Sequence, residues 1–185
     1  EQYADNFNVD ATVDDGSCIY GSANFSFGSI TGDNIQILMD NSEAVGGFQF
    51  TITDNPNLIT ITDASGGSAE EYGFEVSVGS NTGIVLGFSF TGSVIPAGSG
   101  LLTNLSYDLN GSGNTLICID DVIVSDVNGE GLLTEGDCTT VDFASGNAAL
   151  TFGDISPSSM EIYLSNSVEI SGFQFTVTDS PDLVT

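Results

Sequence analysis

The sequence predicts an all-β protein built as a β-sandwich, and three observations carry this prediction. Hydrophobic and polar residues alternate along several short segments, as they do in strands that bury one face. Gly, Asn, Asp and Ser cluster between these segments, where they favour turns. Stretches rich in Ala, Leu and Glu with a 3.6-residue period are missing, so we expect no helix. About eight or nine short strands in one domain are typical of a sandwich.

The strands are expected in order along the chain. In the first clear example Phe48, Phe50 and Ile52 lie on one face, and the polar residues between them lie on the other. Four later segments alternate in the same way, namely 74–78, 84–90, 101–107 and 116–124. Each is long enough for one strand of ordinary length.

The chain contains an internal repeat. Phe27-Gly28-Ser29-Ile30 recurs at 152–155, and the segment 47–60 recurs at 172–185, with an offset of 125 residues at both places (152 minus 27, and 172 minus 47). This predicts three parts: an acidic segment 1–23, a sandwich 24–148, and the first third of a second copy in 149–185.

The second copy has an apolar face that it cannot bury alone. We expect Ile162 and Leu164 on this face, together with Phe173, Phe175 and Val177. Either the chain continues into a full second domain, or another subunit completes this one by strand addition. A head-to-tail contact of that kind that does not close generates a filament.

The charge of the chain excludes whole classes of function. Lys, Arg and His are absent and 26 residues are Asp or Glu, so the formal net charge is −26. No His or Lys can act as a general base, and nucleic acid and anionic membranes are improbable partners. Carboxylate-only catalysis survives in principle, but the adjacent acidic pairs do not favour it because neighbours in a strand point to opposite faces. We therefore expect a non-enzyme, adapted to a saline, Ca²⁺-containing medium outside the cell.

Three stretches in order resemble the cohesin-like family of β-sandwich modules. They are 47–58, an alternating strand that runs into an Asp-Asn-Pro-Asn-Leu turn, then 85–102, and then 118–126. The resemblance implies a jelly-roll sandwich of about nine strands and a role in protein–protein docking. It implies no particular docking residues.

The N-terminal segment is the first candidate metal site. Residues 4–18 are similar to short Cys-bounded acidic modules of secreted bacterial surface proteins, and more loosely to thrombospondin type 3 calcium repeats, although the earlier Cys of that pattern is missing. Ca²⁺ prefers oxygen ligands from flexible loops. The expected ligands are Asp5, Asn6, Asn8, Asp10, Asp14 and Asp15, and the alternative is a solvated acidic leader.

The second candidate metal site is the segment 126–137, whose spacing resembles a dockerin calcium loop. Its expected ligands are Asp126, Asn128, Glu130 and Asp137. The alternative is a plain hairpin turn centred on Asn128. That turn would place Cys118 and Cys138 opposite each other in neighbouring strands, within range of a disulfide.

If Cys118 bonds Cys138, then Cys18, the third cysteine of the chain, has no other cysteine of this sequence to pair with. It is then joined to another chain, separated from a partner that the sequence lacks, or buried as a free thiol. A disulfide implies an oxidising compartment.

These observations lead to two hypotheses about function. The first is an extracellular structural protein of a bacterial surface, a repeat subunit of a polymer or filament that is stabilised by calcium and assembles from copies of itself. The second is a docking module for a dockerin-like partner or a carbohydrate.

Overall fold

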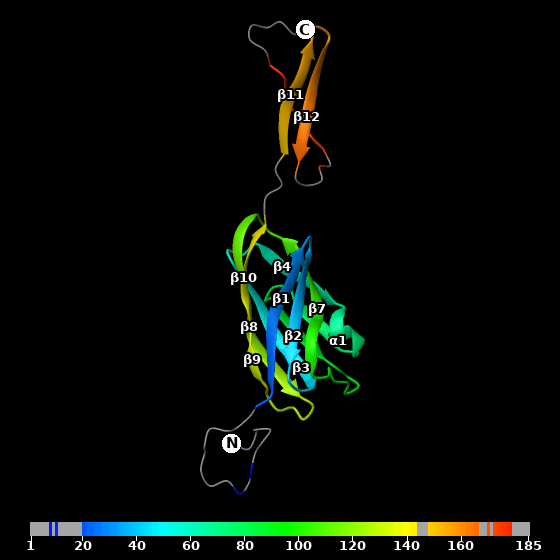
Figure 1. Ribbon diagram of the computed structural model, residues 1–185, viewed down its shortest axis with the longest axis vertical. Coiled ribbons are helices and arrows are strands. Elements are labelled where there is room, and N and C mark those ends of the chain that lie inside the picture. The colour runs from blue at the N-terminus through cyan, green and yellow to red at the C-terminus, as the bar shows by residue number, and fades with distance from the viewer. Residues whose placement is uncertain are drawn as a thin grey trace. The chain divides into compact units, whose positions relative to one another are not determined.

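The computed structural model describes residues 8, 10, 20–143, 148–166, 170 and 172–178. These residues form strands and one short helix (Figure 1). In order they are β1 Ser22–Thr31, β2 Asn34–Asn41, β3 Val45–Asn55, β4 Ile59–Ser65, α1 Gly67–Glu71, β5 Glu75–Gly79, β6 Ile84–Phe88, β7 Gly98–Leu109, β8 Gly113–Asp126, β9 Leu133–Glu135, β10 Cys138–Phe143, β11 Ala148–Ser156 and β12 Ser159–Asn166.

The chain divides into two compact units, Glu1–Phe143 and Ala144–Thr185. The first unit holds β1 to β10, and the second holds β11 and β12. No helix among the described residues is long and apolar enough to cross a membrane.

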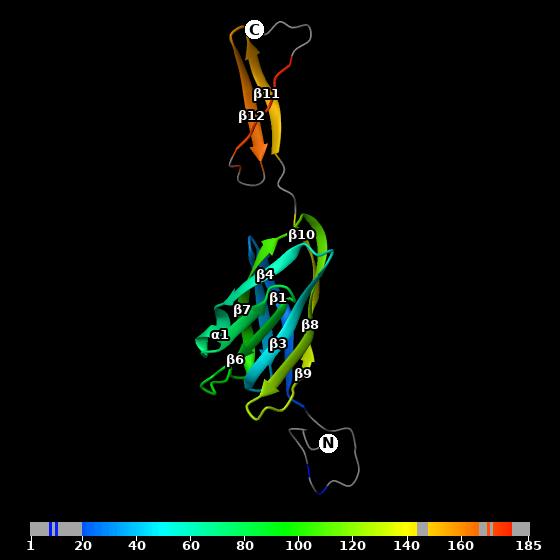
Figure 2. The same cartoon turned by 180° about the vertical axis from the view of Figure 1, so that it is seen from behind.

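The first unit is a sandwich of two five-stranded sheets. Sheet A has the order β4-β7-β2-β1-β9, and sheet B has the order β10-β8-β3-β6-β5. Figures 1 and 2 show the two sheets from opposite sides. All pairings are antiparallel except that of β1 with β9, where the chain crosses from sheet B to the edge of sheet A. The predicted all-β, jelly-roll-like sandwich is confirmed.

The core lies between the sheets and is made by the inward residues of each alternating strand. Phe48, Phe50 and Ile52 of β3 are all buried, as the alternation predicts. Phe50 packs on Phe25 of the opposite sheet with ring centroids 5.5 Å apart, so aromatic rings join the two layers. Burial of such side chains supplies most of the driving force for folding.

The short helix α1 was not expected from the sequence. Gly66 and Gly67 both adopt positive φ, and the Glu70 carboxylate accepts a hydrogen bond from the Gly66 N–H at 2.6 Å. A Cβ on Gly67 would lie 2.4 Å from the carbonyl oxygen of Leu102 on β7, so only glycine fits this contact. Because α1 has five residues, it is too short for a 3.6-residue pattern to be visible.

The second unit repeats the first hairpin of the sandwich. β1 pairs with β2 through Phe27–Ile37 and then shifts register before Ile30, while β11 pairs with β12 through Phe152–Ile162 and shifts before Ile155. These positions differ by the 125-residue offset of the sequence repeat. The second copy therefore reproduces both the strand register and the position of the register shift.

Candidate functional site

The outer face of sheet B carries exposed apolar side chains at its centre. One row crosses four paired strands and consists of Ser77, Leu86, Gln49 and Ile123. Leu86 and Ile123 are 39% and 61% exposed. We call the outward side chains of sheet B the sheet B face.

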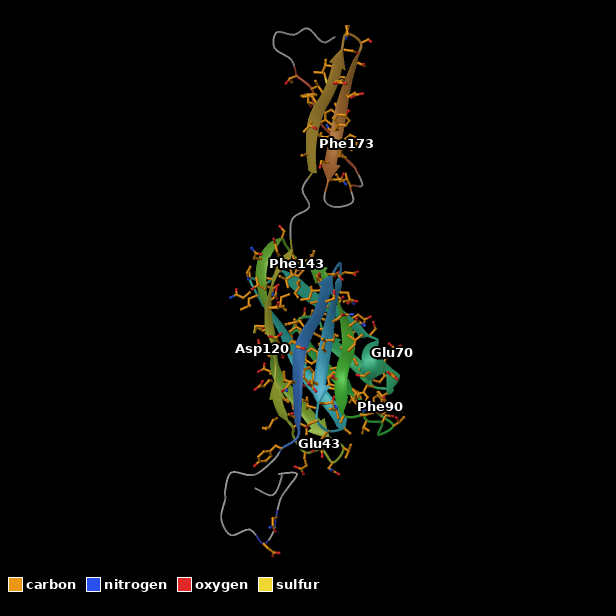
Figure 3. All side chains as sticks on the ribbon, viewed as in Figure 1. Glu43, Glu70, Phe90, Asp120, Phe143 and Phe173 are labelled. Carbon is orange, nitrogen blue, oxygen red and sulfur yellow. A yellow bond between two sulfur atoms is a disulfide. The ribbon has the colours of Figure 1, made fainter. Side chains whose placement is uncertain are left out.

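The neighbouring rows mix polar and apolar side chains. The next row contains Ile84, Thr51 and Asp120. Asp120 accepts a hydrogen bond from the Thr53 hydroxyl at 2.6 Å, so its carboxylate is held against β3. Figure 3 shows Asp120 on the outer side of β8. Leu116, which is 47% exposed, continues the apolar surface toward the other end of β8. Apolar centres with polar rims are typical of protein-binding surfaces.

The outer face of sheet A differs from the sheet B face. Its central strands present Asn24, Gln36, Asp40 and Ser106 outward, and Leu38 there is only partly exposed. The exposed large hydrophobics of this sheet are Leu109, at the end of β7, and Leu133, on the edge strand β9. The sandwich therefore has one outer face suited to docking.

The disulfide predicted between Cys118 and Cys138 is confirmed, with an S–S distance of 2.03 Å. The two cysteines are register partners on β8 and β10. The connection between them is not the regular hairpin that the sequence suggests. It turns at 126–130, then runs beside β1 of the other sheet as β9 before β10 returns to sheet B.

Asp126 organises the turn that begins this connection. Its Oδ1 accepts hydrogen bonds from the N–H groups of Asn128 and Glu130, at 2.9 and 2.7 Å, and its Oδ2 accepts one from the Asn128 side chain at 3.0 Å. Desolvation raises the pKa of Asp126, but these hydrogen bonds and one from the backbone of Gly129 outweigh it, so the pKa lies below its usual value.

The structure brings three of the four residues of the second metal candidate together. Asp126, Asn128 and Glu130 share the turn, whereas the carbonyl of Asp137 accepts a hydrogen bond from the N–H of Ile119, far back along β8. The strand β9 also interrupts the segment 126–137. Among the described residues there is no group of three or more His, Cys, Asp or Glu side chains placed to hold a metal ion. Asp137 therefore lies outside the turn that Asp126, Asn128 and Glu130 share, and calcium binding by the segment 126–137 stays a prediction.

Most of the first metal candidate lies outside the described residues. Of its expected ligands the structure describes Asn8 and Asp10, and the Asp10 N–H donates a hydrogen bond to the Asn8 side chain at 3.0 Å. Asp5, Asn6, Asp14 and Asp15 lie outside the described residues, as does Cys18. Calcium binding by this segment stays a prediction.

The second unit exposes residues whose counterparts are buried in the sandwich. Phe173, Phe175 and Val177 are 69%, 42% and 41% exposed, whereas Phe48, Phe50 and Ile52 at the equivalent positions are 2%, 0% and 6% exposed. Figure 3 labels Phe173 on the segment that follows β12. A hollow of about 150 Å³ lies between this segment and the hairpin.

The signal for the sheet B face was present in the sequence but incomplete. In β6 the apolar alternation of Ile84, Leu86 and Phe88 runs along the outer face, and Val85 between them is the buried residue. In β8 Ile123 lies outward beyond a register shift. The strands of Leu86 and Ile123 are not neighbours in the chain, and only the pairing of both with β3 brings them into one row.

The fold is similar to that of cohesin modules, the family that the sequence motifs resemble. No family model and no curated protein matches the chain. Among solved structures, the third cohesin of ScaC from Acetivibrio cellulolyticus, in complex with the ScaB dockerin, has 11% identity and a TM-score of 0.49 over 68% of this chain and 99% of that one.

Two further cohesin structures are similar to this chain. The cohesin of the Coh-OlpC–Doc435 complex from Clostridium thermocellum has 12% identity and a TM-score of 0.48, over 66% of this chain and 94% of that one. A non-cellulosomal cohesin from Archaeoglobus fulgidus has 16% identity and a TM-score of 0.47, over 64% of this chain and 90% of that one.

Proposed function

We propose that the protein is a non-catalytic extracellular docking module that binds a partner protein through the sheet B face. The observation that carries this proposal is the row in which Leu86 and Ile123 are exposed on either side of Gln49. Exposed apolar side chains gathered on one sheet face cost free energy in water, and a partner that covers them recovers it.

The first partner to test is a dockerin-like module, because the sequence motifs resemble cohesins. A carbohydrate ligand is less well supported, since the chain has no Trp to stack on a sugar ring. An extracellular location is supported by the Cys118–Cys138 disulfide, because such bonds persist in oxidising compartments.

The test is the affinity of the full chain for purified type I and type II dockerin modules, measured by surface plasmon resonance. Ile123→Ser and Leu86→Ser are expected to weaken binding roughly ten-fold or more each, as truncation of central interface residues does. Leu133→Ser is the matched control, because Leu133 is 59% exposed but belongs to sheet A. Absence of binding to both dockerin types, or equal loss in the control, contradicts the proposal.

A second candidate function is a repeat subunit of a surface polymer or filament. It is supported by the second unit, where Phe173 and Phe175 are exposed although Phe48 and Phe50 are buried at the same positions of the first copy. Strands equivalent to β6, β7 and β8 would cover them, supplied by further chain or by a neighbouring copy.

A fusion protein tests this candidate. Residues 61–143 are added directly after Thr185, which continues the repeat at its own spacing. We expect a second cooperative unfolding transition, a second Cys118–Cys138-type disulfide in the added segment, and weaker binding of the dye ANS. The same fusion with Phe175→Asp serves as the control and is expected to lack all three. An added segment that stays unfolded in both versions contradicts the candidate.

We further propose that Ca²⁺ bound to acidic turns offsets the repulsion among the carboxylates during assembly. The support is the formal charge of −26 with no cationic side chain to balance it. Electron microscopy of assembled material before and after chelation with EDTA at low salt tests this. Assemblies that persist unchanged after prolonged chelation contradict a role for calcium.

A further inference from the structure

One edge of sheet A is open at the start of β7. β4 pairs with β7 only from Asn104 to Leu109, so the first residues of β7 have no strand neighbour on that side. α1 covers the edge at Leu101 and Leu102, where Gly67 approaches their carbonyl oxygens. Gly98, Ser99 and Gly100 are exposed, and a Cβ built on either glycine would meet nothing within 4 Å. A short length of strand edge is therefore bare.

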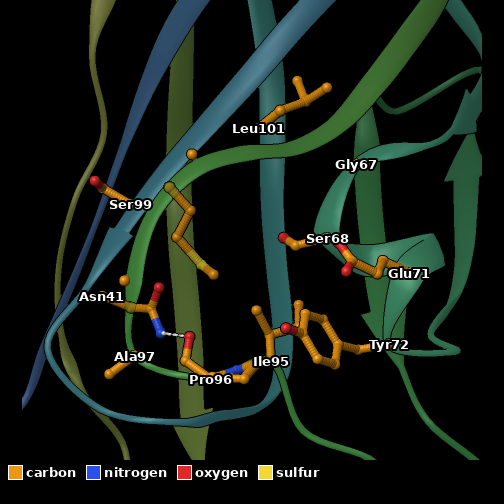
Figure 4. A pocket seen from close by; sticks show the side chains of 13 residues that line it. Asn41, Gly67, Ser68, Glu71, Tyr72, Ile95, Pro96, Ala97, Ser99 and Leu101 are labelled. Carbon is orange, nitrogen blue, oxygen red and sulfur yellow. Dashed lines mark hydrogen bonds between the residues drawn. The ribbon is translucent and has the colours of Figure 1, made fainter.

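This bare edge forms one side of a groove of about 530 Å³. Ser68, Glu71 and Tyr72 of the α1 region line the other side, and Ile95 lies at its base. Figure 4 shows the strand at 97–101 curving past these side chains. We call this space the β7-edge groove.

The β7-edge groove is held open by fixed contacts. Ile95 exchanges two backbone hydrogen bonds with Val45, at 2.8 and 2.9 Å, and is 3% exposed. The side chain of Asn41 donates a hydrogen bond to the carbonyl of Pro96 at 2.9 Å. The backbone that leads into the bare edge is thus anchored to both sheets, and a ligand would not have to order it.

The far side of the groove carries an exposed aromatic ring and an exposed carboxylate. Tyr72 is 38% exposed, and Glu71 is exposed next to it. Within the part of the chain that the structure describes, neither the Glu71 carboxylate nor the Tyr72 hydroxyl has a hydrogen-bond partner. A cationic side chain can form an ion pair with the carboxylate and lie over the face of the aromatic ring.

We propose that the β7-edge groove binds an extended, basic peptide segment of a partner protein. The peptide backbone adds as a strand to β7 at Gly98–Gly100, and a Lys or Arg side chain of the peptide contacts Glu71 and Tyr72. An extended peptide is favoured because a bare strand edge offers alternating N–H and C=O groups with the spacing of another strand.

A basic peptide is favoured by charge complementarity. The chain carries 26 acidic and no cationic side chains, so any partner attracted over long range is cationic. The groove lies away from the sheet B face, on sheet A, and the proposal goes beyond the docking function argued above.

The test uses the full, ¹⁵N-labelled chain and three capped peptides as probes. The first is acetyl-Thr-Val-Lys-Val-Thr-amide, the second replaces Lys by Gln, and the third replaces both Val residues by Pro. The Lys peptide is expected to shift the amide signals of Gly98, Ser99 and Gly100 and to slow their hydrogen exchange. The Gln peptide is expected to bind roughly five-fold to ten-fold more weakly, as loss of an exposed ion pair and a cation–π contact predicts. The Pro peptide is not expected to bind, because two of its five residues have no backbone N–H to donate to a neighbouring strand.

Two variants separate a local site from general charge attraction. Glu71→Gln is expected to weaken the Lys peptide roughly two-fold to five-fold, because it removes the ion pair and leaves the ring of Tyr72 in place. It is expected to leave the affinity for the Gln peptide unchanged. Glu75→Gln removes the same charge from exposed Glu75 on β5 of sheet B, and is expected to change neither affinity. Equal effects of the two variants overturn the proposal, as does the absence of amide shifts at 98–100 with millimolar Lys peptide. A failure here leaves the dockerin measurements on Leu86 and Ile123 unaffected, so the two proposals fail separately.

Discussion

Truncation of equivalent phenylalanines in the two copies should have very different consequences. Phe50 is fully buried between Phe25 and Phe48, with ring centroids 5.5 and 6.2 Å away. Phe175 occupies the same position of the repeat in the second unit and is 42% exposed. We therefore compare Phe50→Ala with Phe175→Ala.

The expected magnitudes follow from burial. Phe50→Ala removes a buried ring and leaves a cavity, which costs about 3–5 kcal/mol of the free energy of unfolding of the sandwich. Phe175→Ala acts in the second compact unit, so the stability of the sandwich should stay within about 0.5 kcal/mol of wild type.

Urea denaturation followed by tyrosine fluorescence and circular dichroism measures both effects. The chain has 5 Tyr and no Trp, and Tyr107 is buried in the sandwich core, where its emission reports the packing of that unit. At a slope of ~2 kcal/mol per molar urea, Phe50→Ala should lower the midpoint by about 1.5–2.5 M.

Two results would refute this reasoning. A Phe175→Ala midpoint as low as that of Phe50→Ala would mean that the second copy folds as part of the sandwich. A loss below about 1 kcal/mol for Phe50→Ala would mean that the ring does not join the two sheets as its contacts indicate.

Three further predictions concern the sandwich. Replacing Cys118 and Cys138 by Ser should lower the free energy of unfolding by about 3 kcal/mol, because the bond closes a loop with a sequence separation of 20. The urea midpoints of the variant and of the reduced wild type should coincide. A variant midpoint equal to that of the oxidised wild type contradicts this prediction. Asp126→Asn should destabilise the protein near neutral pH, because the pKa of Asp126 is lowered in the folded state. The stabilisation from this carboxylate is fully present above its unfolded-state pKa and is lost as pH falls through its folded-state pKa, so the difference in unfolding free energy between variant and wild type should shrink there. A difference that stays constant from pH 7 to pH ~2 argues against this prediction. Gly87→Ala should cost about 1–3 kcal/mol in a thermal or urea melt, because the new Cβ would lie 2.1 Å from a neighbouring phenylalanine ring, whereas Gly131→Ala, built into open space, is the neutral control.

Much of the sandwich could be predicted from local pattern. Alternation identified the inward residues of β3, and Phe48, Phe50 and Ile52 are all buried. The pairing of Cys118 with Cys138 is also as predicted, although β9 lies between β8 and β10 where the prediction assumed a single hairpin turn. The prediction for β3 succeeds because strand periodicity depends on residues close together in the chain.

The helix and the path between β8 and β10 could not be predicted in this way. α1 depends on Gly67 fitting against Leu102, which is distant in sequence. β9 pairs with β1 of the opposite sheet, and this removes Asp137 from the turn of Asp126. Both outcomes depend on contacts between distant segments, which local spacing does not contain.

By itself, the sequence determined the β-sandwich class, the 125-residue repeat spacing and the unbalanced negative charge, because alternation, repetition and composition are properties of the linear chain. Only the tertiary structure decided that Leu86 and Ile123 share one row, and that β7 keeps a bare edge beside Glu71. The physical reason is that surfaces are assembled from strands that pair across long sequence separations. Which side chains meet on such a surface depends on strand order and register, and both are settled by packing of the whole sandwich.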